Sequence, residues 1–119
     1  MNPSRASLLA LVLLVLAISG ASQWWGHRQE MAMGDEIARL AGPGDIQMLA
    51  SDTCAICALA RGWFDSHGVT YTECSIERDA DCRARFDALR APGTPVILVR
   101  GRPELGFDPG RLRARLVEG

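Results

Sequence analysis

Two cysteines separated by two residues, Cys54 and Cys57, form the most reactive motif in this sequence. They follow a short apolar run, residues 46–50, and open a stretch with helical apolar spacing that stops at Gly68. The pair is therefore predicted to lie at a strand-to-helix junction. Free backbone N–H groups and the helix dipole at such a junction stabilise a thiolate and lower the cysteine pKa. The motif thus predicts dithiol redox chemistry.

The segments around the cysteine pair alternate between strand and helix patterns. A strand is expected at 46–50, a helix at 55–67 and a second strand at 69–76. Together they make a right-handed βαβ unit with parallel strands. The helix is expected to bury one face, formed by Ile56, Leu59, Ala60, Trp63, Phe64 and His67.

The remaining chain adds two helices and two strands to this unit. In chain order they are a helix, a fully buried strand, an edge strand and a helix, expected at 80–90, 96–99, 103–107 and from 109 onward. Asp79 and Asp108 precede the helices and can cap them. The inner faces are expected to be Cys82, Phe86 and Leu89, then Leu112 and Leu116. The order βαβαββα predicts an α/β domain, a small sheet flanked by helices.

A Thr94-Pro95 dipeptide stands directly before the expected buried strand. Proline cannot donate to a strand ladder, so Pro95 must begin that strand. The dipeptide alone fits an ordinary trans proline. With the cysteine pair upstream, we predict a cis bond that brings the Thr94 backbone beside Cys54, where an extended peptide could pair with it.

These motifs resemble those of the glutaredoxin family, within the thioredoxin fold. The resemblance covers residues 45–116 and rests on Cys54-Ala55-Ile56-Cys57, His67-Gly68-Val69-Thr70-Tyr71, Ile76-Glu77-Arg78-Asp79, Gly93-Thr94-Pro95-Val96 and Gly106-Phe107-Asp108-Pro109. It implies a four-stranded mixed sheet with three flanking helices. The last motif is closest to small thioredoxin-like glutaredoxins.

The resemblance also implies an activity, thiol–disulfide exchange, and roles for individual residues. Cys54 matches the nucleophilic cysteine, and Cys57 matches the resolving cysteine that releases the product. The matching substrate-binding residues are Thr94, Pro95, Gly106, Phe107 and Asp108. The last three form the helix start that receives a glutathione carboxylate in members that use glutathione.

The residues next to the cysteines depart from the usual family pattern. Ala55 and Ile56 replace the common proline and aromatic residue, and Ser51 replaces a common basic residue. Asp52 adds a negative charge that should raise the pKa of Cys54. A protein disulfide and glutathione both remain open as substrates, and no bound cofactor is expected.

Two further cysteines, Cys74 and Cys82, match no redox position of the family. They could be buried free thiols that pack as small apolar groups. They could instead form a structural disulfide, which would suit an exported domain. A zinc site of all four cysteines lacks the usual two close pairs. A non-catalytic module that binds a metal or an iron–sulfur cluster, or that only binds partners, is the alternative to an enzyme.

The N-terminus carries an apolar segment, residues 1–26, with no charge from residue 6 to residue 26. As a membrane anchor it is long enough to span a bilayer, with Trp24 and Trp25 at the interface. As a cleaved signal peptide it offers small residues, Ser19 and Ala21, before a cleavage point. Either reading places the cysteines outside the cytoplasm, with the bacterial periplasm as the expected compartment.

A linker is expected at 27–44 and the glutaredoxin-like domain at 45–119. Within the linker, apolar residues could form a short amphipathic helix, namely Met33, Ile37, Leu40 and Ala41. The net charge of −1 gives no electrostatic basis for nucleic-acid binding. The chain is expected to be a monomer.

Overall fold

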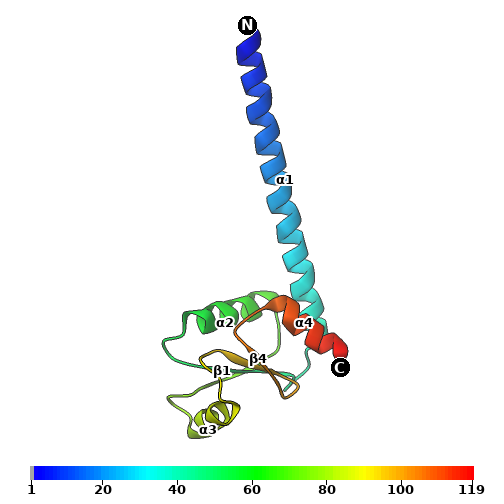
Figure 1. The fold of residues 1–119 in the computed structure, drawn as a ribbon. Coiled ribbons are helices and arrows are strands. Elements are labelled where there is room, and N and C mark those ends of the chain that lie inside the picture. The colour runs from blue at the N-terminus through cyan, green and yellow to red at the C-terminus, as the bar shows by residue number, and fades with distance from the viewer. Residues whose placement is uncertain (1) are drawn as a thin grey trace. The chain divides into compact units, whose positions relative to one another are not determined.

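Residues 2–119, which the computed structural model describes, form four helices and four strands (Figure 1). In order they are α1 (Pro3–Leu40), β1 (Ile46–Ala50), α2 (Ala55–His67), β2 (Thr72–Ser75), α3 (Ala80–Leu89), β3 (Val96–Val99), β4 (Arg102–Leu105) and α4 (Pro109–Glu118). From β1 onward the order is βαβαββα, which confirms the predicted order.

The strands form one mixed sheet in the order β2-β1-β3-β4. β1 runs parallel to β2 and antiparallel to β3, and β3 runs antiparallel to β4. In the register of β1, Leu49 lies opposite Cys74 on one side and Val96 on the other. This four-stranded sheet with three flanking helices is the predicted thioredoxin-like α/β fold.

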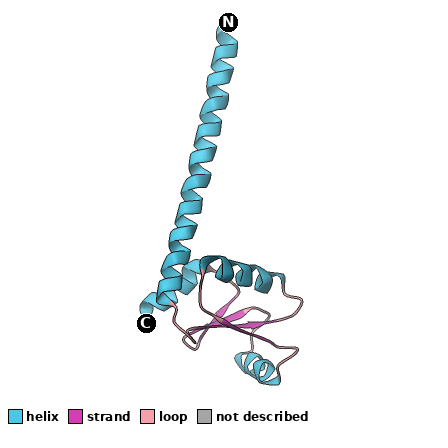
Figure 2. Ribbon diagram, turned by 180° about the vertical axis from the view of Figure 1, so that it is seen from behind, coloured by secondary structure: helices cyan, strands magenta, loops and turns pink. Residues whose placement is uncertain are grey.

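The sheet separates two apolar cores of unequal size. The larger core packs α2 and α4 against one face through Phe64, Leu112 and Met48, among others. The smaller core lies on the other face, under α3, and its buried members are Leu49, Cys82 and Val96. Figure 2 shows α2 and α3 on opposite sides of the sheet. The strands β1 and β3 are buried on both faces because helices cover both.

The end of α1 is part of the larger core. Ile37 is fully buried there, and Ala41 is 5% exposed. The structure therefore differs from the expected linker at 27–44, since the chain stays helical to Leu40 and packing begins before residue 45. The apolar spacing from Met33 to Ala41 explains this, because one helical face can then reach the sheet.

The chain divides into two compact units, Met1–Ala32 and Met33–Gly119. The helix α1, most of which lies in the first unit, is apolar enough to cross a membrane by length and composition, with a mean hydropathy of 2.0 over 18 residues. A signal sequence meets the same criterion. The Arg28 guanidinium lies 4.3 Å from the centre of the Trp24 ring, a cation–π contact at the end of the apolar stretch.

Several sequence expectations about element boundaries and faces were wrong in detail. β2 starts at Thr72, not at 69, and β4 occupies 102–105, not 103–107. On α2 the buried residues are Cys57, Ala60 and Phe64, while Ile56 and Leu59 are 49% and 59% exposed. The buried stripe shares Ala60 and Phe64 with the predicted one but turns toward Cys57 and away from Ile56 and Leu59. Leu89 is also exposed, because it ends α3.

Candidate active site

Cys54 and Cys57 lie at the start of α2 and are joined by a disulfide. Cys54 is the N-cap, with an extended backbone, and its Sγ accepts the Cys57 backbone N–H at 3.0 Å. Cys57 is fully buried, whereas Cys54 is half-buried. An approaching molecule therefore meets Cys54 first, and the same N–H can stabilise a Cys54 thiolate after reduction.

A tight turn after β1 places Cys54 at the helix start. The Cys54 N–H donates to the Ser51 carbonyl at 3.2 Å, and the Ala58 N–H donates to the Cys54 carbonyl at 3.2 Å. The first bond closes the turn and the second begins the helix. The cysteine is thus held between a buried strand and the first turn of α2.

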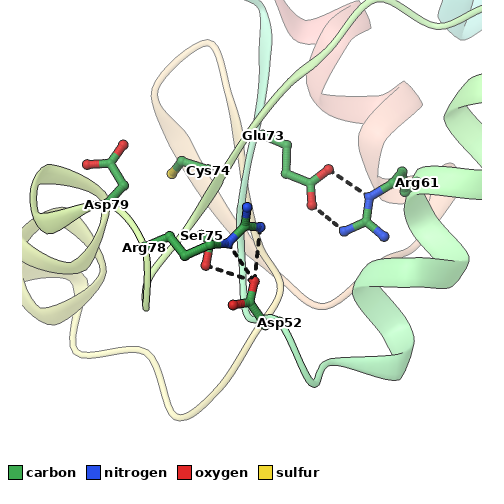
Figure 3. A pocket seen from close by; sticks show the side chains of 7 residues that line it. All are labelled: Asp52, Arg61, Glu73, Cys74, Ser75, Arg78 and Asp79. Carbon is green, nitrogen blue, oxygen red and sulfur yellow. Dashed lines mark hydrogen bonds and ion pairs between the residues drawn. The ribbon is translucent and has the colours of Figure 1, made fainter.

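Polar residues at the end of β2 and just after it hold the turn before Cys54. Glu77 accepts hydrogen bonds from the Ser51 hydroxyl and the Asp52 backbone N–H. The Ser75 hydroxyl donates to Asp52 Oδ1 at 3.0 Å, and Arg78 makes an ion pair with the same oxygen at 3.0 Å. Figure 3 shows Ser75 and Arg78 converging on Asp52. We call Ser51, Asp52, Ser75, Glu77 and Arg78 the turn cluster.

The turn cluster changes the electrostatic expectation for Cys54. Alone, Asp52 should raise the pKa of this thiol, because a second negative charge disfavours a thiolate. Arg78 brings a positive charge to the Asp52 carboxylate and offsets that effect. The sequence did not reveal this pairing, because the two residues are 26 positions apart and meet only through the parallel pairing of β1 with β2.

Glu77 is held in its ionised form by the same contacts. The Ser51 hydroxyl, followed by the Asp52 N–H and the Ser75 hydroxyl, lowers the pKa of Glu77 to about 2. The carboxylate is therefore a stable acceptor at neutral pH. Glu77 and Arg78 belong to one of the family-like motifs, but the sequence suggested no role for them.

The predicted substrate loop and the start of α4 are linked directly. The Thr94-Pro95 peptide bond is cis, as predicted, and Pro95 is buried. The Pro95 carbonyl accepts the Gly106 N–H at 2.9 Å. Phe107 then packs edge-on against Phe64 of α2, with ring centres 5.5 Å apart. These contacts fix the loop and the start of α4 to the element that carries the dithiol.

The Asp108 side chain caps the helix that follows it, α4. Its side chain accepts the Arg111 N–H at 3.2 Å as the N-cap of α4, and Pro109 follows at the first helical position. Because proline has no N–H, this helix start has one donor fewer for an external anion.

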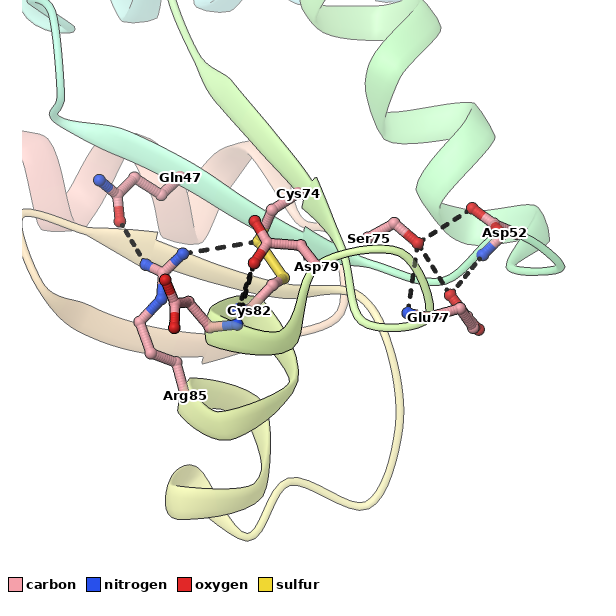
Figure 4. The surroundings of a disulfide bond; sticks show 9 residues. Gln47, Asp52, Cys74, Ser75, Glu77, Asp79, Cys82 and Arg85 are labelled. Atoms are coloured by element: carbon pink, nitrogen blue, oxygen red, sulfur yellow. Dashed lines mark hydrogen bonds between the residues drawn. A yellow bond between two sulfur atoms is a disulfide. The ribbon is translucent and has the colours of Figure 1, made fainter.

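The other two cysteines, Cys74 and Cys82, are joined by a disulfide on the opposite face of the sheet. The bond connects β2 to the first turn of α3 (Figure 4). They therefore lie apart from the Cys54–Cys57 pair. Among residues 2–119, no three His, Cys, Asp or Glu side chains are grouped so that they could hold a metal ion.

A pocket of about 590 Å³ lies beside β2. Its lining is charged and comprises Asp52, Arg61, Glu73, Cys74, Ser75, Arg78 and Asp79 (Figure 3). Arg61 pairs with Glu73 and Arg78 pairs with Asp52 across it. The charged side chains of the pocket therefore largely pair with one another, and Cys74, which is half-buried, forms part of its wall.

Comparison with known proteins agrees with this geometry. The glutaredoxin family model matches residues 46–103, which include both cysteines of the dithiol and the cis-proline loop. No curated protein sequence matches the chain.

Several solved structures share the fold. A mutant of the thioredoxin-like protein BC3987 is 24% identical, with a TM-score of 0.55, over 62% of this chain and 96% of that chain. A buckwheat glutaredoxin–glutathione complex is 18% identical, with a TM-score of 0.52, over 76% of this chain and 90% of that chain. An Archaeoglobus fulgidus glutaredoxin is 17% identical, with a TM-score of 0.50, over 63% of this chain and 87% of that chain. Residues 46–103, in the thioredoxin-like domain that begins at β1, thus match the glutaredoxin family.

Proposed function

We propose that this chain is a thiol–disulfide oxidoreductase in which Cys54 attacks and Cys57 resolves. The observation that carries the proposal is the asymmetry of the pair at the start of α2. Cys54 is half-buried and its sulfur accepts a helix N-terminal N–H, whereas Cys57 is fully buried. Only the first sulfur is placed to meet an external disulfide.

The reaction follows from this placement. The Cys54 thiolate attacks one sulfur of a substrate disulfide, forms a mixed disulfide and releases the other substrate sulfur as a thiolate. The Cys57 thiolate then attacks the Cys54 sulfur. This second step releases the remaining substrate thiol and leaves the Cys54–Cys57 disulfide, so that two electrons have passed to the substrate.

The surroundings of the dithiol favour a protein disulfide over a glutathione mixed disulfide as the substrate. Ile56 and Leu59, next to the cysteines on α2, expose apolar side chains that a protein segment could cover. At the start of α4, the Asp108 carboxylate already accepts the Arg111 N–H. A buckwheat glutaredoxin of similar fold was crystallised with glutathione, which makes glutathione the competing co-substrate.

The proposed substrate contacts are those that the family resemblance indicated. Thr94 and Pro95 would present backbone to an extended substrate segment, with Gly106 and Phe107 beside them. Their support is the Pro95–Gly106 hydrogen bond and the packing of Phe107 on α2.

We further propose that the domain works outside the cytoplasm, in the periplasm, and is anchored by residues 1–26. The apolar first unit and the aromatic pair Trp24–Trp25 support an anchor. Arg5 gives the short N-terminal end a positive charge, which favours keeping that end in the cytoplasm. The chain after the anchor would then be exported.

Serine substitutions of the two cysteines test the assignment. The full-length chain, in detergent, would be assayed on a peptide disulfide and on a glutathione mixed disulfide. Cys54→Ser should lose turnover on both, because Cys57, the thiol that remains in this pair, is fully buried. Cys57→Ser should accumulate mixed disulfides through Cys54, visible by mass spectrometry. Retained turnover in Cys54→Ser would overturn the proposed function.

A further inference from the structure

We propose that the Cys74–Cys82 disulfide is a second thiol–disulfide site, opened by an external dithiol through Cys74, and that its state controls the reactivity of Cys54. The proposal goes beyond the dithiol function proposed above and rests on it. Three features of the structure carry it: the accessibility of Cys74, the weak attachment of α3, and the position of the turn cluster inside the loop that the bond closes.

The two disulfides cannot exchange directly. Cys54 and Cys57 pack with the larger core, and Cys74 and Cys82 pack with the smaller core across the sheet. The second bond therefore lies outside the exchange cycle of the first. Any reductant that opens it must come from outside the molecule.

Cys74 is the less buried of the two cysteines and so the one that such a reductant would attack. It is half-buried and lines the charged pocket, whereas Cys82 is fully buried. Arg85 Nη2 lies 3.6 Å from Cys74 Sγ, and Arg85 Nη1 donates to Gln47 Oε1 at 3.2 Å (Figure 4). This guanidinium would attract an incoming thiolate and stabilise the negative charge shared by the reacting sulfurs.

The exchange at this site balances as a two-electron step. A thiolate of the external dithiol attacks Cys74 Sγ, the S–S bond breaks, and Cys82 leaves as a thiolate that takes a proton. The second thiol of the reductant then displaces Cys74, which is protonated in turn. The reductant leaves as a disulfide, and the protein gains two electrons and two protons.

Opening the bond would loosen α3. Within α3, all of which the structure describes, Cys82 is the one buried residue, and Phe86 is half-buried. The core beneath the helix is also the smaller one. With so little apolar area to hold it, the helix depends on its covalent link to β2.

The loop closed by the bond contains the residues that hold the catalytic turn. Ser75, Glu77 and Arg78 lie between Cys74 and Cys82 (Figure 4 shows the first two). They supply every contact of the turn cluster to Ser51 and Asp52 described above. When α3 loosens, Asp52 loses Arg78, and its charge then raises the pKa of Cys54.

Alkylation of Cys54 measures this coupling without any substrate. In the full-length Cys57→Ser variant, Cys54 is a free thiol while the Cys74–Cys82 disulfide remains. Replacing Cys74 and Cys82 by alanine in that background should shift the pH profile of Cys54 alkylation upward and slow alkylation severalfold at neutral pH, since less of the thiol is then ionised. This assay measures alkylation and not turnover. A chain with no turnover would therefore contradict the proposed oxidoreductase function but not the coupling between the two cysteine pairs.

Two single substitutions, one test variant and one control, still test the coupling if the variant with both cysteines replaced by alanine folds poorly. Arg78→Gln leaves the second bond in place, removes the positive charge that offsets Asp52 and should shift the profile in the same direction. Arg83→Gln is the matched control, because Arg83 pairs with Asp87 on the exposed side of α3 and should leave the profile unchanged. Coincident profiles for the parent, the alanine pair and Arg78→Gln would overturn the coupling.

The exchange itself is tested by graded dithiothreitol on the native wild-type chain, followed by alkylation and mass spectrometry. We expect Cys74–Cys82 to open without denaturant, and Arg85→Met to slow the opening severalfold. Opening that occurs only after unfolding would show an inert structural bond and would overturn the second site.

Discussion

The reactivity of Cys54 depends on charges that single residues place around its turn. The thiolate gains from the Cys57 N–H and would lose from Asp52, whose charge Arg78 offsets. The ion pair is well exposed, with 76% of the Arg78 side chain accessible, so its own contribution to stability is at most about 1 kcal/mol. The Asp52–Arg78 ion pair therefore matters more for the pKa of the Cys54 thiol than for the stability of the fold.

Glu77 makes an acid-dependent contribution to stability at this scale. Its pKa is about 2 in the folded chain, against an ordinary value of 4.5. A lowered carboxyl pKa stabilises the fold fully above pH 4.5, and this stabilisation is lost as the pH falls from 4.5 towards 2. We expect Glu77→Gln to be less stable than wild type at pH 7 and to lose less stability over that window.

Thermal unfolding of both proteins between pH 2 and pH 7 checks this expectation. Other carboxyl groups with lowered pKa, such as Glu73 beside Arg61, give both proteins a common acid-dependent background. The difference between the two curves of stability against pH isolates the contribution of the Glu77 carboxylate. Parallel curves would mean that the carboxylate is not bound as described.

At the scale of elements, the contact between the end of α1 and α2 depends on a glycine. A Cβ at Gly34 would lie 1.9 Å from Cδ2 of His67. The imidazole has little room to move, because it stacks on Trp63 with ring centres 4.2 Å apart and its Nδ1 lies 2.8 Å from the Trp63 carbonyl oxygen. Close approach of the two helices therefore requires the absence of a side chain at position 34.

Gly34→Ala should destabilise the domain by about 1–3 kcal/mol, the usual cost of overpacking a tight contact. Chemical denaturation of the full-length chain would measure it. Gly62→Ala is the matched control: Gly62 is also helical, no atom lies within 4 Å of its Cβ position, and alanine there should stabilise by about 0.5–1 kcal/mol. Equal effects of the two substitutions would disprove the contact.

The sequence predicted the order of elements and the position of the dithiol because both depend on local patterns. Apolar spacing, capping residues and prolines mark each element where it occurs. The partner of Asp52 could not be predicted, because Arg78 approaches it only through strand pairing. The exposure of Ile56 and Leu59 was also missed, since a stripe of apolar residues does not say which of two adjacent faces meets the sheet.

At the scale of the whole molecule, the proposed anchor predicts where the protein is found. We expect the full-length chain to remain in membranes after an alkaline carbonate wash, because about 20 apolar residues can span a bilayer. A membrane-impermeant thiol reagent should label reduced Cys54 from the outer side. A soluble mature form beginning at Ser22 would show instead that the segment is a cleaved signal peptide.

The most direct test of the oxidoreductase assignment is a redox titration of the full-length chain in glutathione buffers. Alkylation and mass spectrometry would follow each cysteine separately. We expect Cys54–Cys57 to titrate reversibly near the glutaredoxin range of about −200 to −230 mV, with Cys54 alkylated faster than buried Cys57. A pair that forms neither a disulfide nor a glutathione adduct would contradict the assignment.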